Sequence, residues 1–266
     1  MTTIDLPAPL PSLPVARLAT SGVPDQLHHG DCLQLLPQMP SGSVDMVFAD
    51  LPYGVTRSRW DLPIPLDALW AELKRVLKPG GAVVMTATQP FTSLLVMSNP
   101  AWFKYDQVWV KTIASNQMNV RHQPLRKHES ALVFYGQRGT YNPQRTAGEP
   151  YTITRRASRF ENTYGTQRDH VATNSGIREP TTVLTFPNPR VSGAHSAAKP
   201  VELVEHFIKT FTNPGDVVLD PVMGGGSAAV AALRTGRRFI GIEQEAHWVE
   251  YARIRLAAEN ISDAVA

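Results

Sequence analysis

Near the C-terminus, a short apolar strand leads into a glycine-rich turn that opens a helix. The predicted strand 216–219 is followed by Asp220–Ser227 (DPVMGGGS) and then by a predicted helix over 228–235. Glycines at such a junction let the backbone approach a ligand at the topological switch point of an open α/β sheet. Strand and helix continue to alternate through 239–242 and 245–258. The sequence therefore predicts an α/β fold with a largely parallel sheet.

An acidic residue follows at the distance expected for a nucleoside-binding site. Glu243 ends the next predicted strand, 23 residues after Asp220, where a carboxylate can accept hydrogen bonds from both ribose hydroxyls. A dinucleotide and S-adenosylmethionine are the two ligands to compare. Asp220 would repel a pyrophosphate and suits the ammonium of a methionine group, which favours S-adenosylmethionine. The predicted cofactor-binding residues in this segment are Asp220, Met223, Gly224, Gly226, Ser227, Glu243 and Gln244.

A second candidate site follows the apolar strand 44–49, which stops at Asp50-Leu51-Pro52-Tyr53. The exocyclic amine of a base is a poor nucleophile, because its lone pair is delocalised into the ring. A carboxylate and a main-chain carbonyl that accept its two N–H groups favour the positive charge that develops on methylation. Asp50 offers the carboxylate and Leu51 the carbonyl, which Pro52 helps to aim by favouring extended backbone at Leu51. Tyr53 offers an aromatic face to a base that has left the duplex stack.

The rest of the chain divides by composition. Residues 1–24 are rich in proline and predict a loose tail. Apolar residues spaced three and four apart predict an amphipathic helix over 66–77, and strands are expected over 82–86, 103–111 and 131–135. A further helix is expected after Pro200. Residues 137–180 have no sustained period, so a long loop region is expected there.

Cysteine and histidine usage excludes several classes of protein. Cys32 is the only cysteine, so no internal disulfide forms, and the eight histidines lack the HExxH spacing of a metal site. Cys32 also lacks a preceding proline, which argues against a cytosine-C5 methyltransferase, and no G-x-S-x-G motif suggests a serine hydrolase. No apolar run approaches the ~18 residues of a membrane span. We therefore expect a cytoplasmic protein without a membrane partner.

Positive charge is concentrated in one part of the chain. Residues 112–198 hold eleven Arg or Lys against five Asp or Glu, although the whole chain carries only +3. Ten of the eleven are Arg, which can bind phosphate or guanine through two hydrogen bonds. A polyanion partner and a merely solvated insert both remain open on charge alone. The candidate DNA-binding residues are Arg121, Arg126, Lys127, Arg155, Arg156 and Arg159.

Taken in order, these motifs resemble the beta class of DNA amino-methyltransferases. Asp50–Tyr53 resembles the DPPY motif and Asp220–Ser227 the DPFMGSGT motif, and the catalytic motif precedes the cofactor motif as in that class. His29–Cys32 resembles a segment that contacts the cofactor's adenine, and His195–Pro200 resembles HPTQKP. The resemblance runs from about residue 27 to 258 and includes four further segments: Gln89–Phe91, Trp109–Lys111, Arg126–Glu129 and Thr140–Gln144.

The resemblance implies a fold, a reaction and partners. The fold is Rossmann-like and circularly permuted, with a seven-stranded sheet that contains one antiparallel strand. The implied reaction transfers a methyl group from S-adenosylmethionine to an exocyclic amine of double-stranded DNA, with the target base flipped out. Adenine is the expected base, since relatives that methylate cytosine more often carry Ser in place of Asp50. A homodimer and a cognate restriction endonuclease are the further partners suggested.

The resemblance also assigns residues and segments. It adds Asp31, Cys32, His195 and Lys199, together with Asp50, to the cofactor site. The expected segments are a catalytic half over 25–111, a target-recognition insert over 112–194, a cofactor half over 195–258 and a tail over 259–266.

Three departures from the family pattern leave the required groups in place. Leu51 replaces a proline, Val222 replaces a phenylalanine, and Ser196 and Ala197 replace proline and threonine. The alternatives are a cytosine amino-methyltransferase, an enzyme that modifies RNA or a protein amide, and a non-catalytic DNA-binding module. RNA and protein-amide enzymes usually carry Asn-Pro-Pro-Tyr, and a non-catalytic module would tolerate loss of Asp50, Asp220 or Glu243.

Overall fold

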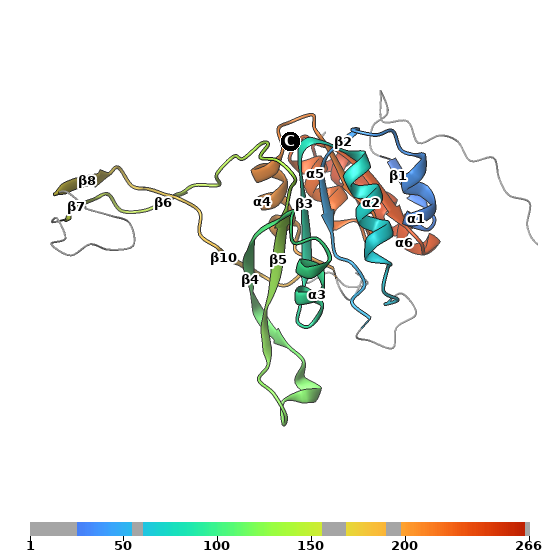
Figure 1. Cartoon of the computed structure of the whole chain (residues 1–266), viewed down its shortest axis with the longest axis horizontal. Helices are drawn as coiled ribbons and strands as arrows, with labels where there is room; N and C mark the ends of the chain where they lie inside the picture. Colours follow the sequence, from blue (N-terminus) through green and yellow to red (C-terminus); the bar gives the residue numbers. More distant parts are fainter. Residues whose placement is uncertain (1–25, 55–60, 156–168, 190–197, 264–266) are drawn as a thin grey trace, which may run out of the picture.

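The centre of the molecule is an eight-stranded sheet with the order β1-β12-β11-β2-β3-β5-β4-β10 (Figure 1). The computed structural model describes residues 26–54, 61–155, 169–189 and 198–263. The strands of this sheet are β1 (Gln26–His29), β2 (Val44–Ala49), β3 (Leu77–Ala87), β4 (Phe103–Ser115), β5 (Arg126–Phe134), β10 (Val183–Phe186), β11 (Val217–Asp220) and β12 (Arg238–Glu243).

The sheet is parallel except at one strand. β5 pairs antiparallel with both β3 and β4, whereas every other neighbouring pair runs parallel. This confirms the expected mostly parallel sheet with one antiparallel strand. The resemblance implied seven strands, and the eighth is β10, which extends the edge by pairing with β4.

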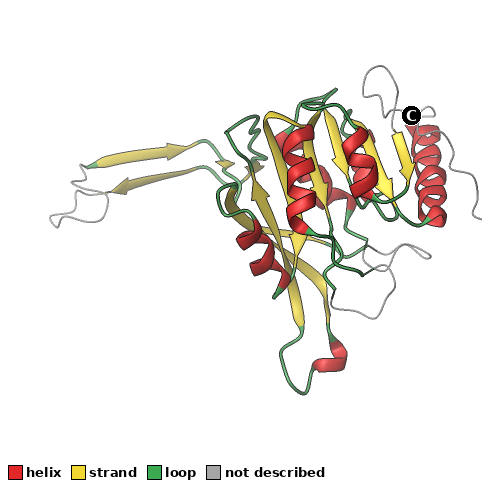
Figure 2. Cartoon of the chain, turned by 45° about the vertical axis from the view of Figure 1, so that its right-hand side comes forward, coloured by secondary structure: helices red, strands yellow, loops and turns green. Residues whose placement is uncertain are grey.

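Helices cover both faces of the sheet (Figure 2). They are α1 (Cys32–Leu35), α2 (Leu66–Val76), α3 (Phe91–Ser98), α4 (Val201–Phe211), α5 (Ser227–Arg234) and α6 (Ala246–Asp263), with short 3-10 turns η1 (Leu36–Gln38) and η2 (Gln117–Asn119). Alternate residues of β2 belong to two different apolar clusters: Met46 and Phe48 pack with α4 and α5, and Val47 and Ala49 pack with α1 and α2. Burial on both faces explains why this strand is apolar without a break.

The range predicted to be an insert contributes two strands to the main sheet. β5 lies inside the sheet between β3 and β4, and β10 lies at its edge, although both fall within 112–194. The division into a catalytic half, a target-recognition insert and a cofactor half stays a prediction. Outside the sheet, that range supplies the turn between β4 and β5 and the segment 135–182.

The segment 137–180 is not simply a loop region. It contains two antiparallel pairs, β6 (Thr146–Ala147) with β9 (Ile177–Arg178), and β7 (Tyr151–Arg155) with β8 (His170–Asn174). The β7–β8 ribbon projects far from the sheet, and the β4–β5 hairpin extends beyond its neighbours in another direction (Figure 1). Sequence periodicity missed the ribbon because neither of its faces is buried, so no apolar alternation is required.

Among the described residues, no helix combines the length and the apolar character needed to cross a bilayer. Residues 1–24, which were predicted to form a loose tail, lie outside the described part of the chain, as do the last three residues of the tail expected over 259–266.

Candidate active site

Four neighbouring parallel strands each end within two residues of an acidic residue. Asp220 closes β11 and Glu243 closes β12, while Asp50 directly follows β2 and Asp31 follows β1 and Gly30. Because β1, β12, β11 and β2 are consecutive and parallel, their carboxyl ends share one edge of the sheet. The sequence separates these four carboxylates by up to 212 residues, and the strand order brings them to one edge.

A cleft of about 390 Å³ opens at this edge. Its volume lies within the range of about 300–1,000 Å³ that small-molecule sites occupy. Eleven of the predicted residues line it: Asp31, Cys32, Asp50, Pro52, Lys199, Asp220, Met223, Gly224, Ser227, Glu243 and Gln244. Leu51, Tyr53 and Gly226 are not part of the lining, and His195 lies outside the described residues.

Glu243 holds the glycine turn in place beside the cleft. One Glu243 carboxylate oxygen accepts the Gly224 N–H at 2.9 Å, and the other accepts the Glu245 N–H at 2.8 Å. Gly226 precedes α5 with a φ of +75°, and a Cβ there would meet the Cβ of Ala252 at 2.8 Å. Only glycine suits both the left-handed backbone and this close approach. Gly226 therefore shapes the turn without lining the cleft.

Asp220 and Asp31 are fixed in different ways. Asp220 is buried, and one carboxylate oxygen accepts the Val222 N–H at 3.0 Å. Burial raises the pKa of Asp220 well above its ordinary value, and Asp50 and Glu243 raise it further. Asp31 caps α1 by accepting the Leu33 N–H at 2.9 Å. It is only half-buried and lines the cleft.

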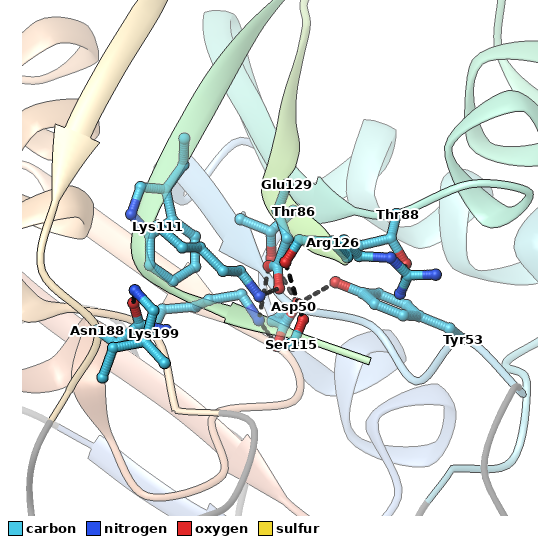
Figure 3. Close-up of polar contacts among 12 residues, drawn as sticks. Asp50, Tyr53, Thr86, Thr88, Lys111, Ser115, Arg126, Glu129, Asn188 and Lys199 are labelled. Carbon is cyan, nitrogen blue, oxygen red and sulfur yellow. Dashed lines mark hydrogen bonds and ion pairs between the residues drawn. The ribbon is translucent and has the colours of Figure 1, made fainter. Parts of the chain in front are cut away.

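The Asp50 carboxylate is surrounded by three donors (Figure 3). Its Oδ1 atom accepts hydrogen bonds from the Tyr53 hydroxyl at 2.7 Å and the Thr86 hydroxyl at 2.5 Å. Its Oδ2 atom accepts from the Lys199 ammonium. Burial raises the pKa of Tyr53 well above its ordinary value, and the Asp50 and Glu129 carboxylates add to the increase. Tyr53 thus keeps its proton and acts as a donor to Asp50.

The other residues of the catalytic motif differ in exposure. Leu51 is buried in the apolar core, whereas Pro52 is half-buried and lines the cleft. The Tyr53 ring packs on Phe91 with the ring centroids 5.1 Å apart. The hydroxyl of Tyr53 points to Asp50 (Figure 3), so the side chain is held by its ring and by its hydroxyl.

The residues present at the cleft fit S-adenosylmethionine. A buried carboxylate, Asp220, suits the ammonium of its methionine group, and Glu243 at the tip of β12 suits its ribose hydroxyls. Half-buried Trp248 adds an aromatic lining residue, which the sequence did not single out. A cleft with a mainly apolar lining and a few convergent polar groups is the usual form of a cofactor site.

Comparison with known proteins decides the family. A family model described as DNA methylase, for the N6/N4 methyltransferase group, matches residues 44–253. This chain belongs to the DNA methylase family. It is an S-adenosylmethionine-dependent DNA amino-methyltransferase, of the group that acts on N6 of adenine or N4 of cytosine.

Curated relatives of the methylase extend over almost the same length. Type II methyltransferase M2.DpnII of Streptococcus pneumoniae is 29% identical, with 88% of this chain and 90% of the relative covered. DNA adenine methyltransferase YhdJ of Escherichia coli (strain K12) is also 29% identical, with 86% of this chain and 81% of the relative covered.

Solved structures show the same fold at low sequence identity. The M1.HpyAVI–SAM complex has a TM-score of 0.59 at 22% identity, covering 87% of this chain and 98% of that one. The cytosine-N4-specific PvuII DNA methyltransferase has a TM-score of 0.61 at 18% identity, covering 88% of this chain and 86% of that one. At these identities the likeness supports the fold only.

Three residues around Asp50 received no role from the sequence of the methylase. Thr86 on β3 was not singled out, and Lys111 and Glu129 appeared only within family-like segments. Glu129 forms ion pairs with Lys111 and with Lys199, and all three side chains are buried. The sequence did carry a signal for Lys111 and Glu129, because Lys and Glu are rarely buried on apolar strands unless they are paired.

Those predicted DNA-binding residues that the structure describes are absent from the lining of the methylase's cleft. Arg121 and Lys127 are exposed on the β4–β5 hairpin. Arg126 is half-buried at the start of β5, and its guanidinium donates to the Thr88 hydroxyl at 3.2 Å. Arg155 ends β7, and Arg156 and Arg159 lie outside the described residues.

Proposed function

We propose that this methylase transfers a methyl group to the exocyclic N6 amine of adenine in double-stranded DNA, with the base flipped out of the helix. The observation that carries the proposal is the Asp50 carboxylate, which lies at the tip of β2 and lines the cleft. The curated relative named DNA adenine methyltransferase YhdJ points to the same target base. Relatives that act on cytosine more often carry Ser at this position.

Each residue of the motif has a proposed part in the reaction. S-adenosylmethionine, when bound, supplies an activated methyl group on a sulfonium. Asp50 accepts one N–H of the target amine and Leu51 offers its carbonyl to the other, so that the nitrogen lone pair is freed from the ring. The negative charge of Asp50 then favours the positive charge that grows on this nitrogen. Tyr53 lies beside the amine, where its ring contacts the flipped base.

Asp50 has room for that substrate contact. A carboxylate has about four lone-pair directions, two on each oxygen. In the described part of the chain, Oδ1 receives the Tyr53 and Thr86 hydroxyls and Oδ2 receives one donor, Lys199. The second direction of Oδ2 is left for the target amine.

The target base is tested by the nucleosides that the enzyme makes. DNA from a methylase-deficient host, incubated with the purified enzyme and S-adenosylmethionine, is digested and analysed by mass spectrometry. We expect 6-methyladenine and no 4-methylcytosine, and the same reaction with the Asp50→Ala variant provides the blank. Detection of 4-methylcytosine alone would reassign the base and leave the role of Asp50 unchanged. Absence of any methylated nucleoside would count against the proposed activity.

We also propose that the β4–β5 hairpin and the segment 135–182 bind the DNA backbone. Between Lys111 and Glu129 the hairpin carries three cations and no acidic residue. Its exposed Arg121 and Lys127 can reach a phosphate without breaking a described contact.

Salt dependence tests this proposal. Each phosphate contact that is lost lowers the slope of log K against log salt by about 0.9. Replacing Arg121 and Lys127 by Gln should lower the slope by up to about 1.8, and replacing Arg155, Arg156 and Arg159 by up to about 2.7. Fluorescence anisotropy with a labelled duplex between 50 and 200 mM salt measures the slope. Arg253→Gln, on the exposed face of α6, is the control. Unchanged slopes in both variants would mean that these cations are only a solvated surface.

A further inference from the structure

Four charged side chains form a continuous line from the catalytic motif into the sheet (Figure 3). The Lys199 ammonium contacts Asp50 and lies 3.4 Å from Glu129 Oε2, while Glu129 Oε1 pairs with Lys111. The exposed fractions are 7% for the Lys199 side chain and 10% each for Glu129 and Lys111. The line joins residues from the tip of β2, from β5, from β4 and from the segment before α4.

Stability alone does not account for this arrangement. Removing charges from water costs several kcal/mol per ion, and apolar residues of similar size often serve a fold as well as a buried ion pair does. Contact with the cofactor does not account for it either, because Glu129 and Lys111 do not line the cleft. The charges must therefore be explained by what they do to Asp50, at the end of the line.

One oxygen of Glu129 interacts with Lys199 as an ion pair without a hydrogen bond. Glu129 Oε2 is buried and has no hydrogen-bond partner among the described residues, although the Lys199 ammonium lies 3.4 Å away. Lys199 is therefore shared between two anions. Because both carboxylates hold the Lys199 ammonium, it cannot move together with Asp50 alone. The ammonium therefore occupies one fixed side of the Asp50 carboxylate, and the target amine must approach from the other.

We infer that Lys199 and Glu129 are positioning residues for the reaction: together they hold the Asp50 carboxylate in one orientation, with a single acceptor direction left for the target amine. The inference rests on the proposed role of Asp50. It also changes the role expected for Lys199, from a cofactor contact to a partner of the catalytic carboxylate.

The electrostatics of the surrounding groups agree with this geometry. Burial lowers the pKa of Lys199, but Asp50 and Glu129 outweigh burial and raise it overall. Burial likewise raises the pKa of Glu129, but Lys199 and Lys111 outweigh it and lower the pKa overall. Further ionisable groups near this line, within the described residues, are Asp220 on β11, Glu243 on β12, Tyr53 and Arg126. Glu129 and Lys199 are thus both charged at neutral pH.

Two variants should move opposite limbs of the pH–rate profile. In Lys199→Met, the Asp50 and Glu129 carboxylates face each other with no cation between them, so the pair takes up a proton more readily and the acid limb moves to higher pH. In Glu129→Gln, Lys199 loses one of the two anions that hold its proton, so the alkaline limb moves downward. We expect kcat at saturating S-adenosylmethionine and DNA to fall at least tenfold in each. The affinity for S-adenosylmethionine, measured by calorimetry, should change less than about threefold.

Three further variants make the test decisive. Lys209→Met breaks a pair with Glu205 on α4, where Lys209 is half-buried, and should leave both limbs in place. The double variant Lys199→Met/Glu129→Gln should lose less than the product of the two single losses, because both act through Asp50. Thermal unfolding would reveal a single variant that fails to fold. In that case the double variant still measures the effect of removing both charges. Asp50→Asn tests the underlying role of Asp50 separately.

The outcomes separate the two ideas. If Asp50→Asn keeps its rate, the proposed role of Asp50 fails and this inference fails with it. If Asp50→Asn is inactive but neither limb moves in the other variants, only the positioning role is overturned. A large loss of S-adenosylmethionine affinity in Lys199→Met, with an unmoved acid limb, would return Lys199 to the cofactor site.

Discussion

Replacing Asp50 by Ala should abolish methyl transfer while the enzyme still binds S-adenosylmethionine. Asp50 is assigned to the target amine, whose positive charge grows only as the methyl group is transferred. An interaction that strengthens in the transition state affects kcat more than substrate binding. Loss of one preorganised electrostatic partner in a comparable site costs about 10²–10³-fold in rate. Transfer of a labelled methyl group to DNA in a single turnover measures the effect.

The Asp50 prediction needs variants that separate chemistry from structure. Asp50→Asn keeps the shape and the contact with Thr86 but removes the charge, so it should lose nearly as much activity as Asp50→Ala. Asp106→Ala, at an exposed position on β4, is the matched control and should retain the full rate. If the Asp50 variants keep more than about a tenth of the wild-type rate, less than ~1.4 kcal/mol is lost and Asp50 is not the key acceptor.

Asp220→Ala and Glu243→Ala should each weaken the binding of S-adenosylmethionine. Each is expected to remove a charge-assisted hydrogen bond to the cofactor, worth about 1.5–3 kcal/mol, or roughly ten- to a hundredfold in affinity. Glu243 also holds the N–H groups of Gly224 and Glu245, so its loss releases the glycine turn as well. Titration calorimetry measures the affinity, and circular dichroism confirms that both variants fold. Unchanged affinity in both would remove the cofactor assignment from this edge of the sheet.

The same experiment has a pH dependence with a defined sign. Burial raises the pKa of Asp220 in the free protein, and a bound ammonium would lower it again. Binding therefore favours the ionised form. The affinity for S-adenosylmethionine should rise with pH until Asp220 is ionised in the free enzyme, and should fall as the pH drops through that pKa. The Asp220→Ala variant should lose this part of the dependence.

Local sequence patterns predicted the elements that carry the site. The apolar run of β2 and the three-and-four spacing of α2 are local features, and both elements formed within one residue of the predicted bounds. Asp50, Asp220 and Glu243 could be placed at one edge because parallel strands present their carboxyl ends together. Their roles remain predictions until the variants above are measured.

Contacts between distant residues could not be read from such patterns. Glu129 and Lys199 are 70 residues apart, and their pairing depends on how β5 lies relative to the segment before α4. A buried charge on an apolar strand shows that a partner exists, but does not say which residue it is. The β7–β8 ribbon was missed for another reason: its strands pair with each other alone, so the apolar period that marks a half-buried strand is missing.

The projecting β7–β8 ribbon takes no part in the packing of the sheet that carries the active site. None of its described residues belongs to either apolar cluster of the sheet, so substitutions along it disturb no packing there. The chain leaves the sheet after β5 and returns to it at β10, with the ribbon carried between these two strands. The ribbon can therefore change in sequence or in length while the packing that places the four acidic strand tips stays the same.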